Sequence, residues 1–410
     1  MRRNSARPTV ATVPAIRAVA AGLLGLAAAL PIAGCGSTPA TSASVRPAAG
    51  ISTPALATAL AAPDGGANWA VLEMGGSAAQ HNNFWELFAR PAGGSAWKLA
   101  TPVGVASNGG IVATVTGSSS LLAGVRPSQD LKYSPLAQTA NAGTDWSQNN
   151  ILEAGLADLP TALAAGPSGR LLAVIGSGDI DTSSGSGVSW SRLTTQRALD
   201  ATPAGRACGI TAVTAAGWTP AGDPLLGGDC LKHGIAGIFT AAAGTWRAAA
   251  PTLPAALAGD PVSVIGLNTT GTRTTAVLAV GTGAATGVIA AWSANGGGNW
   301  TLSPELRTGP SAGPSVSFGA DGSATLVLPG KHASSRGQGA TISWQSATWQ
   351  QLPTLPAYTA TIAATQSGTP EALAARGGTL TVWQLPAAGS AGHWQLTQTV
   401  HVAIPYGSSS

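Results

Sequence analysis

Short runs of apolar residues recur along the chain, and each follows a turn rich in glycine, proline or polar residues. In a half-buried strand apolar and polar residues alternate, whereas these runs are almost continuously apolar. Continuous apolarity over such a short length is typical of strands whose two faces are both covered by other parts of the fold. The runs are residues 121–125, 171–175, 276–280, 324–328 and 371–375.

A second pattern, a polar glycine-rich turn followed by a tryptophan, recurs through most of the chain. Its clearest copy is residues 293–301, S-A-N-G-G-G-N-W-T, which predicts that Trp300 stands at the start of a strand. Similar turns precede six other tryptophans, and successive tryptophans are 44 to 56 residues apart. A period of this length with turn signals indicates a β-propeller, in which each repeat forms one blade. The seven tryptophans are Trp97, Trp146, Trp190, Trp246, Trp300, Trp349 and Trp394.

Each repeat predicts four strands. A short first strand is followed by the apolar second strand, by an often aromatic third strand that includes Trp85, Trp292 or Trp344, and by a fourth strand after the tryptophan turn. We expect an all-β fold, a seven-bladed β-propeller of four-stranded antiparallel blades, with a six-bladed ring as the alternative. The ring is one domain, residues 55–406, because its blades bury their faces only against each other. The expected blades are 55–104, 105–154, 155–202, 203–256, 257–310, 311–356 and 357–406.

The tryptophan turn resembles the Asp-box of sialidase-like (BNR) propellers, whose pattern is S-x-D-x-G-x-T-W. Serine or threonine, glycine and tryptophan occupy the matching places at 183/187/190, 293/297/300 and 139/143/146. The aspartate position holds Gly185, Asn295 and Asn141. The residue types suit a folding device: the short polar side chain bonds its own backbone, the glycine takes a positive φ, and the tryptophan packs between blades. The resemblance implies a box that lies far from the ligand.

The N-terminal residues have the three parts of a secretory signal peptide. Four arginines and an apolar run over 18–32, too short to span a bilayer comfortably, precede I-A-G-C at 32–35. The I-A-G-C segment resembles the bacterial lipobox, which implies lipidation of Cys35; ordinary secretion is the alternative. We expect a signal peptide over 1–34, a flexible tether over 35–54, and an extracytoplasmic protein held at the cell membrane by its lipid.

The charge balance excludes one class of partner. The chain carries 20 Lys and Arg against 16 Asp and Glu. Four of the basic residues and none of the acidic ones precede Cys35, so the expected mature protein is formally neutral. A neutral protein lacks the electrostatic footprint of nucleic-acid binding. The alanine- and glycine-rich, lysine-poor composition resembles that of actinobacterial proteins.

The other two cysteines, Cys208 and Cys230, lie symmetrically about a turn. Their midpoint is Thr219, inside the polar turn at 217–223. Two strands that fold back at this turn would place the cysteines opposite each other, and an exported protein meets oxidising conditions. We therefore expect a hairpin disulfide, with two free thiols as the alternative.

The sequence contains no recognisable catalytic set. A sialidase needs three arginines around a carboxylate, a tyrosine nucleophile paired with a glutamate, and an aspartate acid/base. The F/Y-R-I-P segment of that family is missing, and none of Tyr133, Tyr358 and Tyr406 has a glutamate close in sequence. Arginines are spread over the repeats, so a triad formed in space remains open.

Metal ions and cofactors are not expected. Residues 179–183, D-I-D-T-S, begin like a calcium loop, but the twelfth position is Trp190, where a bidentate glutamate belongs. We expect a solvated polar loop there. The five histidines show neither H-x-H nor H-E-x-x-H spacing.

The longest expected loops join second and third strands and therefore lie on one face of the ring. We expect a non-catalytic binding or scaffold module for a protein or an envelope glycan, with a divergent sialidase-like glycoside hydrolase as the alternative. Exposed aromatic residues such as Trp85 or Trp218 would favour binding, whereas three arginines and a tyrosine at the central channel would favour the enzyme. The loops are residues 75–83, 126–132, 176–187 and 330–339.

Overall fold

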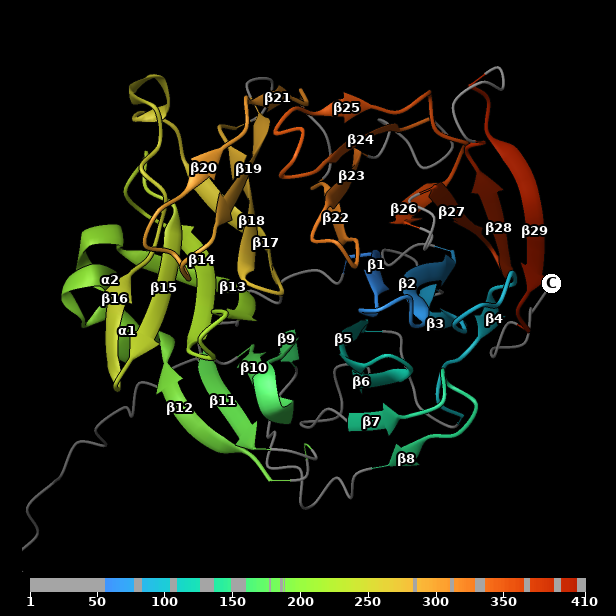
Figure 1. Cartoon of the computed structure of the whole chain (residues 1–410), viewed down its shortest axis with the longest axis horizontal. Helices are drawn as coiled ribbons and strands as arrows, with labels where there is room; N and C mark the ends of the chain where they lie inside the picture. Colours follow the sequence, from blue (N-terminus) through green and yellow to red (C-terminus); the bar gives the residue numbers. More distant parts are fainter. Residues whose placement is uncertain are drawn as a thin grey trace, which may run out of the picture. The chain divides into compact units, whose positions relative to one another are not determined.

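The apolar runs form buried strands in the structure, which is a computed structural model of the chain (Figure 1). It describes residues 56–403 except 77–82, 104–108, 126–135, 149–159, 177, 185–186, 188, 283–285, 310–312, 329–335, 365–368 and 387–391. The described residues belong to one compact unit, Ala49–Ser410. The expected signal peptide over 1–34 and the tether over 35–54, with Cys35, lie outside them.

The strands of the described residues form seven antiparallel meanders of four strands each, in chain order. The first strands are β1 (Thr58–Ala61), β5 (Ile111–Gly117), β9 (Pro160–Ala165), β13 (Ile210–Trp218), β17 (Val262–Thr270), β22 (Ser315–Phe318) and β26 (Thr359–Ala364). The second strands are β2 (Asn68–Gly75), β6 (Ser120–Val125), β10 (Arg170–Ile175), β14 (Pro224–Cys230), β18 (Arg273–Val280), β23 (Ala324–Leu328) and β27 (Pro370–Arg376).

The outer half of each meander completes a blade. The third strands are β3 (Asn83–Arg90), β7 (Leu136–Thr139), β11 (Asp179–Ser184), β15 (Gly237–Ala242), β19 (Gly287–Ser293), β24 (Gln338–Ile342) and β28 (Thr379–Gln384). The fourth strands are β4 (Lys98–Leu99), β8 (Ser147–Gln148), β12 (Ser191–Thr195), β16 (Thr245–Ala248), β20 (Thr301–Leu302), β25 (Gln350–Gln351) and β29 (Gln395–His401). One further strand, β21 (Leu306–Arg307), pairs with β19 in the fifth blade. The expected all-β propeller is confirmed.

The apolar runs lie in second strands that are largely buried, as expected. Five of the six residues of β10 and all five residues of β23 are buried. Neighbouring blades cover the two faces of these strands, so no solvent-facing polar position interrupts them. In Figure 1 the first strand of each blade lies innermost and the later strands follow outward.

Each of the seven tryptophans packs at a seam between two blades. Seven apolar clusters join consecutive blades, and each seam holds the tryptophan of the later blade. The expected position of the tryptophan between blades is therefore confirmed. Each repeat of the tryptophan turn in the sequence corresponds to one seam between blades. In order from the seam of the first and second blades, the tryptophans are Trp146, Trp190, Trp246, Trp300, Trp349 and Trp394, with Trp97 at the seam of the seventh and first blades.

The tryptophan turn of the fifth blade is a hydrogen-bonded loop built from its own side chains. The hydroxyl of Ser293 accepts a hydrogen bond from the backbone N–H of Gly297 at 2.8 Å. The amide oxygen of Asn295 accepts from the backbone N–H of Asn299 at 2.9 Å. The oxygen that an aspartate would use is therefore present in asparagine as well, which explains why the turn forms without the aspartate of the Asp-box pattern.

The turn of the second blade has the same bonds. Thr139 accepts from the N–H of Gly143 at 3.0 Å, and Asn141 accepts from the N–H of Asp145 at 2.9 Å. In both turns the glycine has a positive φ, 80° at Gly143 and 99° at Gly297. The recurrence of one bonding scheme in two blades shows that these turns are a structural repeat.

Each of these glycines also lies against the end of the preceding blade. A Cβ atom on Gly297 would stand 2.7 Å from the Cβ atom of Ala249 and 2.9 Å from its carbonyl oxygen. The indole N–H of Trp300 donates to the same carbonyl at 2.7 Å. The turn thus docks on the residue that follows β16, and a side chain on Gly297 would push the two blades apart.

Two short helices between the third and fourth blades were not expected. They are α1 (Gln196–Asp200) and α2 (Pro203–Cys208), and two single 3-10 turns lie at Pro167–Gly169 and Ala255–Leu257. The side chain of Thr202 caps α2 by accepting from the N–H of Gly205 at 3.0 Å. Threonine before proline is a helix-start signal, so the sequence did contain a local indication of α2.

The expected disulfide between Cys208 and Cys230 is present, with Cα atoms 5.0 Å apart. The hairpin of β13 and β14 also forms as expected, and it pairs Ile210 with Cys230. Cys208 itself is the last residue of α2 and lies just before the hairpin. The disulfide therefore ties the helical insertion to the end of β14.

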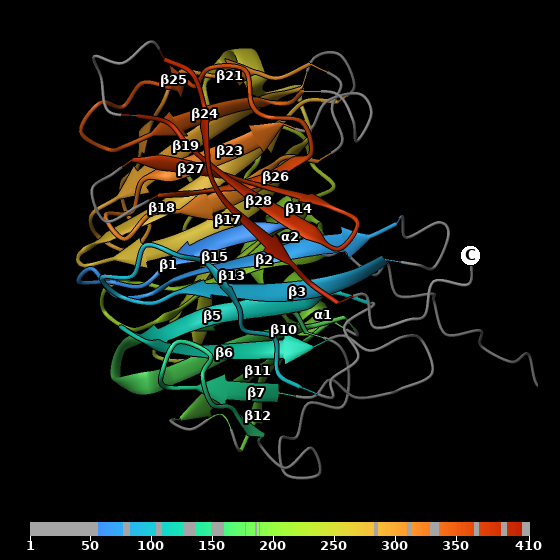
Figure 2. The same cartoon turned by 90° about the vertical axis from the view of Figure 1, so that its right-hand side faces the viewer.

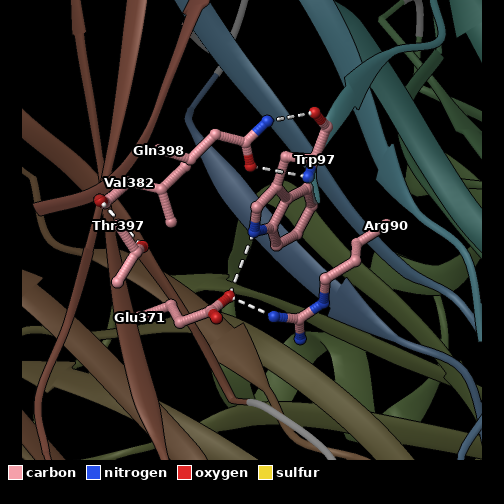
Figure 3. A network of polar contacts seen from close by, with 6 residues as sticks. All are labelled: Arg90, Trp97, Glu371, Val382, Thr397 and Gln398. Carbon is pink, nitrogen blue, oxygen red and sulfur yellow. Dashed lines mark hydrogen bonds and ion pairs between the residues drawn. The ribbon is translucent and has the colours of Figure 1, made fainter. Parts of the chain in front are cut away.

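The first and seventh blades meet without sharing a strand. In Figure 2 the strands of the first blade lie between those of the seventh and second blades. The carboxylate of Glu371 in β27 accepts from Arg90 at 2.5 Å and from the indole N–H of Trp97 at 3.0 Å (Figure 3). The side chain of Gln398 donates to the backbone oxygen of Trp97 at 2.7 Å and accepts from its N–H at 2.8 Å. Arg90 and Glu371 are both buried, so this pair is shielded from solvent.

Substitution of Gly297 by alanine tests the docking of the turn. We expect Gly297→Ala to lower the free energy of unfolding by about 3 kcal/mol, because an overpacked seam adds to the strain of the positive φ. Gly271→Ala is the control, since Gly271 has φ 58° and no atom within 4 Å of an added Cβ. That variant should lose about 1 kcal/mol. Equal losses in denaturant titrations of the two variants would show that close packing at Ala249 contributes nothing.

A double-mutant cycle tests the seam of the first and seventh blades. Arg90→Met or Glu371→Leu alone should cost about 3–5 kcal/mol, because each leaves the other charge buried without its partner. The double variant should cost clearly less than the sum of the two. Additive losses in equilibrium unfolding would mean that the ion pair does not couple the two blades.

Candidate functional site

The innermost strands surround a hollow of about 380 Å³ that carries no charged group. Strands of the first six blades contribute to it, and its lining consists of apolar residues, threonines, glycines, one asparagine and Trp218. It contains no arginine and no tyrosine. A carboxylate could find no cation there, so this described part of the channel does not have the arrangement expected of a sialidase.

Four of the described arginines contact aromatic rings instead. The guanidinium carbon of Arg170 lies 4.3 Å from the ring centre of Trp218, and that of Arg376 lies 5.0 Å from Tyr358. Arg90 is held by Glu371 at the blade seam. Arg90, Arg170 and Arg376 come from the first, third and seventh blades, and none of them lines the central hollow. Tyr133 and Tyr406 lie outside the described residues.

An open hollow of about 330 Å³ lies between the fifth and sixth blades, and we call it the tryptophan–arginine hollow. Arg273 is the first residue of β18, and Trp344 stands in the turn after β24. The guanidinium of Arg273 stacks on Trp344 with 3.6 Å between its central carbon and the ring centre. The complete lining is Arg273, Trp292, Ala294, Asn295, Asn299, Trp300, Thr301 and Trp344.

The hollow combines exposed and anchored side chains. Trp344 is 41% exposed, which is unusual for a tryptophan, whereas Trp292 is 5% exposed. The indole of Trp300 is fixed by its bond to Ala249, and the exposed Asn295 and Asn299 belong to the same hydrogen-bonded turn. The indole of Trp300 and the side chain of Asn295 are therefore held in place before any ligand arrives, which lowers the entropy lost on binding.

The lining of the hollow contains no Asp, Glu, His, Cys or Tyr. Glycoside hydrolysis by the usual mechanisms uses two carboxyl groups at a set separation, and a hydroxyl nucleophile such as that of Thr301 needs a general base, which this lining lacks. The arrangement offers flat apolar rings, amides, a hydroxyl and one cation. It can bind a ligand but holds no group that would cleave one.

Trp85 and Trp218, whose exposure would have favoured binding, are both buried. Trp85 is 5% exposed because the second blade covers β3, and Trp218 is 3% exposed because it packs at the seam of the third and fourth blades. Trp344 was expected inside a third strand, yet β24 ends at Ile342 and Trp344 stands in the following turn. Among the residues that the structure describes, the exposed aromatic residue is Trp344, which lies on the side of the ring opposite the second-to-third loops.

The segment 179–183 is also different from the expectation. It is strand β11 and not a polar loop, because Asp179 and Asp181 both pair with residues of β12. Asp179 forms an ion pair with Arg192 at 2.5 Å. Burial, followed by the nearby charge of Asp179, raises the pKa of Asp181. The described residues contain no group of three or more His, Cys, Asp or Glu side chains that could hold a metal ion.

Two other polar side chains have local partners. Glu73 accepts from the side chain of Asn83 at 2.9 Å. The ring of His233 bonds the carbonyl of Gly259 at 2.8 Å. These contacts are structural. Most of the loops at 75–83, 126–132 and 330–339 fall outside the described residues.

The part of the chain that the structure describes has no helix long and apolar enough to cross a membrane. Its two α-helices have five and six residues.

Comparison with known proteins supports the fold. No protein-family model and no curated protein matches the sequence. The GH74 xyloglucanase from Xanthomonas campestris aligns with a TM-score of 0.56 and 12% identity over 84% of this chain and 54% of the xyloglucanase. A putative 6-phosphogluconolactonase from Bacteroides uniformis aligns with a TM-score of 0.52 and 10% identity over 82% of this chain and 97% of its own. At such identities the similarity extends to the β-propeller architecture and not to an activity.

Proposed function

We propose that this protein is a non-catalytic binding module that holds an envelope glycan in the tryptophan–arginine hollow. The observation that carries the proposal is the exposed Trp344, stacked on the half-buried Arg273 beside two further tryptophans and two exposed asparagines, in a lining without any acid. Aromatic rings contact the C–H faces of sugars, and amides bond their hydroxyls. The lack of carboxyl groups favours binding over hydrolysis.

We further propose that the propeller is exported and lipid-anchored through Cys35. The I-A-G-C segment after an apolar run supports this, as does the disulfide between Cys208 and Cys230, because disulfides persist in oxidising compartments. An anchor followed by the tether over 35–54 would present the hollow to glycans outside the membrane.

Removal of the Trp344 indole tests glycan binding. Trp344→Ala should weaken retention on an envelope-glycan array by about tenfold or more, since an exposed aromatic anchor is lost. Leu396→Ala is the matched control, because Leu396 is 51% exposed in β29 of the seventh blade. Thermal unfolding of both variants should match that of the unchanged protein.

The same protein should release no fluorophore from a panel of fluorogenic glycosides. Cleavage that disappears when one carboxylate or tyrosine is replaced would establish the hydrolase instead. Absence of glycan retention by the unchanged protein would contradict the proposed ligand and direct attention to protein partners.

Replacement of Cys35 tests the anchor. Cys35→Ser should move the protein from the membrane fraction to the soluble fraction and abolish labelling by a fatty-acid analogue, because no other cysteine is free to be lipidated once Cys208 and Cys230 are bonded. Unchanged membrane retention and labelling would contradict lipidation at this residue.

A further inference from the structure

We propose that the tryptophan–arginine hollow selects sugars that carry an anionic substituent, a carboxylate or a phosphate, through the guanidinium of Arg273; this inference rests on the proposed glycan binding. The observation behind it is the charge of the hollow. Its lining holds one arginine and no acidic residue. The ion pairs found among the described residues use Arg90 and Arg192. Arg273 therefore presents an uncompensated positive charge to the hollow.

The stacking of Arg273 leaves its hydrogen-bond donors available. A guanidinium has five N–H donors that lie in its plane, and a stacked ring occupies only its flat face. At 3.6 Å from the ring centre of Trp344, the guanidinium is the closest of the four arginine–aromatic contacts among the described residues. No hydrogen bond joins these donors to another described side chain. The indole of Trp344 thus orients the guanidinium of Arg273 and leaves its N–H donors available to an anion.

The other stacked arginines have structural roles that Arg273 lacks. Arg90 is buried and bound to Glu371 at a blade seam. Arg170 covers the buried Trp218, and Arg376 lies over Tyr358 within its own blade. Among the described arginines, Arg273 alone lines an open hollow together with three tryptophans.

The shape of the hollow adds a second requirement. The planar fork of an arginine matches two oxygens of a carboxylate or a phosphate at once. The indoles of Trp292, Trp300 and Trp344 need an apolar surface beside that anion, and Asn295 and Asn299 supply amides for hydroxyl groups. A neutral sugar offers no negative charge to the guanidinium of Arg273. A small inorganic anion offers no apolar surface to the indoles. A sugar ring with an anionic substituent satisfies both.

Pyranoses that differ only at the sixth carbon test this selection. Glucose, glucuronate and glucose 6-phosphate share one ring and carry a hydroxymethyl group, a carboxylate or a phosphate; the galactose and mannose series repeat the comparison. The full chain, purified in detergent, is titrated with each sugar and with inorganic phosphate by ligand-observed NMR. In at least one series an anionic sugar should bind about tenfold more tightly than its neutral counterpart. Added salt should reduce this advantage.

Variants assign the selection to Arg273. Arg273→Gln removes the charge, so the anionic preference should fall below about twofold while the affinity for the neutral sugar changes little. Arg273→Lys keeps the charge without the planar fork and should retain part of the preference. Arg247→Gln is the control, because Arg247 is exposed on β16 and does not line the hollow; it should leave all affinities unchanged.

Each opposite outcome has a separate meaning. Equal affinity for neutral and anionic sugars would overturn the selection and leave glycan binding intact. A preference that survives Arg273→Gln would place the anion at another residue and overturn the assignment. Inorganic phosphate that binds as tightly as the sugar phosphate would overturn recognition of the ring. Binding of no sugar in any series would overturn both this inference and the proposed function.

Discussion

The ring depends on the contact between its first and last blades, because these are the two neighbouring blades that the polypeptide does not link directly. At the other six seams the polypeptide runs from one blade into the next. At this seam the neighbours are held by the apolar cluster around Trp97 and by the buried pair of Arg90 and Glu371. Two buried charges cost much desolvation energy, and the indole N–H of Trp97 offsets part of it by a further bond to the same carboxylate. The position of every other blade follows once this contact forms.

The propeller could be predicted from the sequence because the repeated tryptophans mark contacts between blades and not merely a preference for strands. Each tryptophan belongs to one seam, so the spacing of tryptophans counts the seams directly. The departures were local. The helices before β13 are only five and six residues long, too short for an apolar period to be visible. Asp179 and Asp181 looked like loop residues, and pairing with β12 made them part of a strand.

The candidate site could be predicted much less well, because exposure of an aromatic residue depends on what a distant part of the chain places over it. Trp85, Trp218 and Trp344 look alike in sequence. The second blade covers Trp85, and the seam of the third and fourth blades encloses Trp218. Trp344 stays exposed because β24 ends two residues before it. The stacking of Arg273 joins residues 71 positions apart, on two blades. No local pattern predicts such a pair, although the polar turn at 293–301 contains five of the eight lining residues.

Because every blade consists of one uninterrupted piece of chain, the order of the blades is not tied to the position of the termini. Joining the end of β29 to the start of β1 and opening the chain between any other two blades would leave all seven meanders covalently whole. The seam of Arg90 and Glu371 would then become an ordinary linked seam, and a new one would have to hold by side chains alone. A set of circular permutants would therefore rank the seven seams by their intrinsic strength.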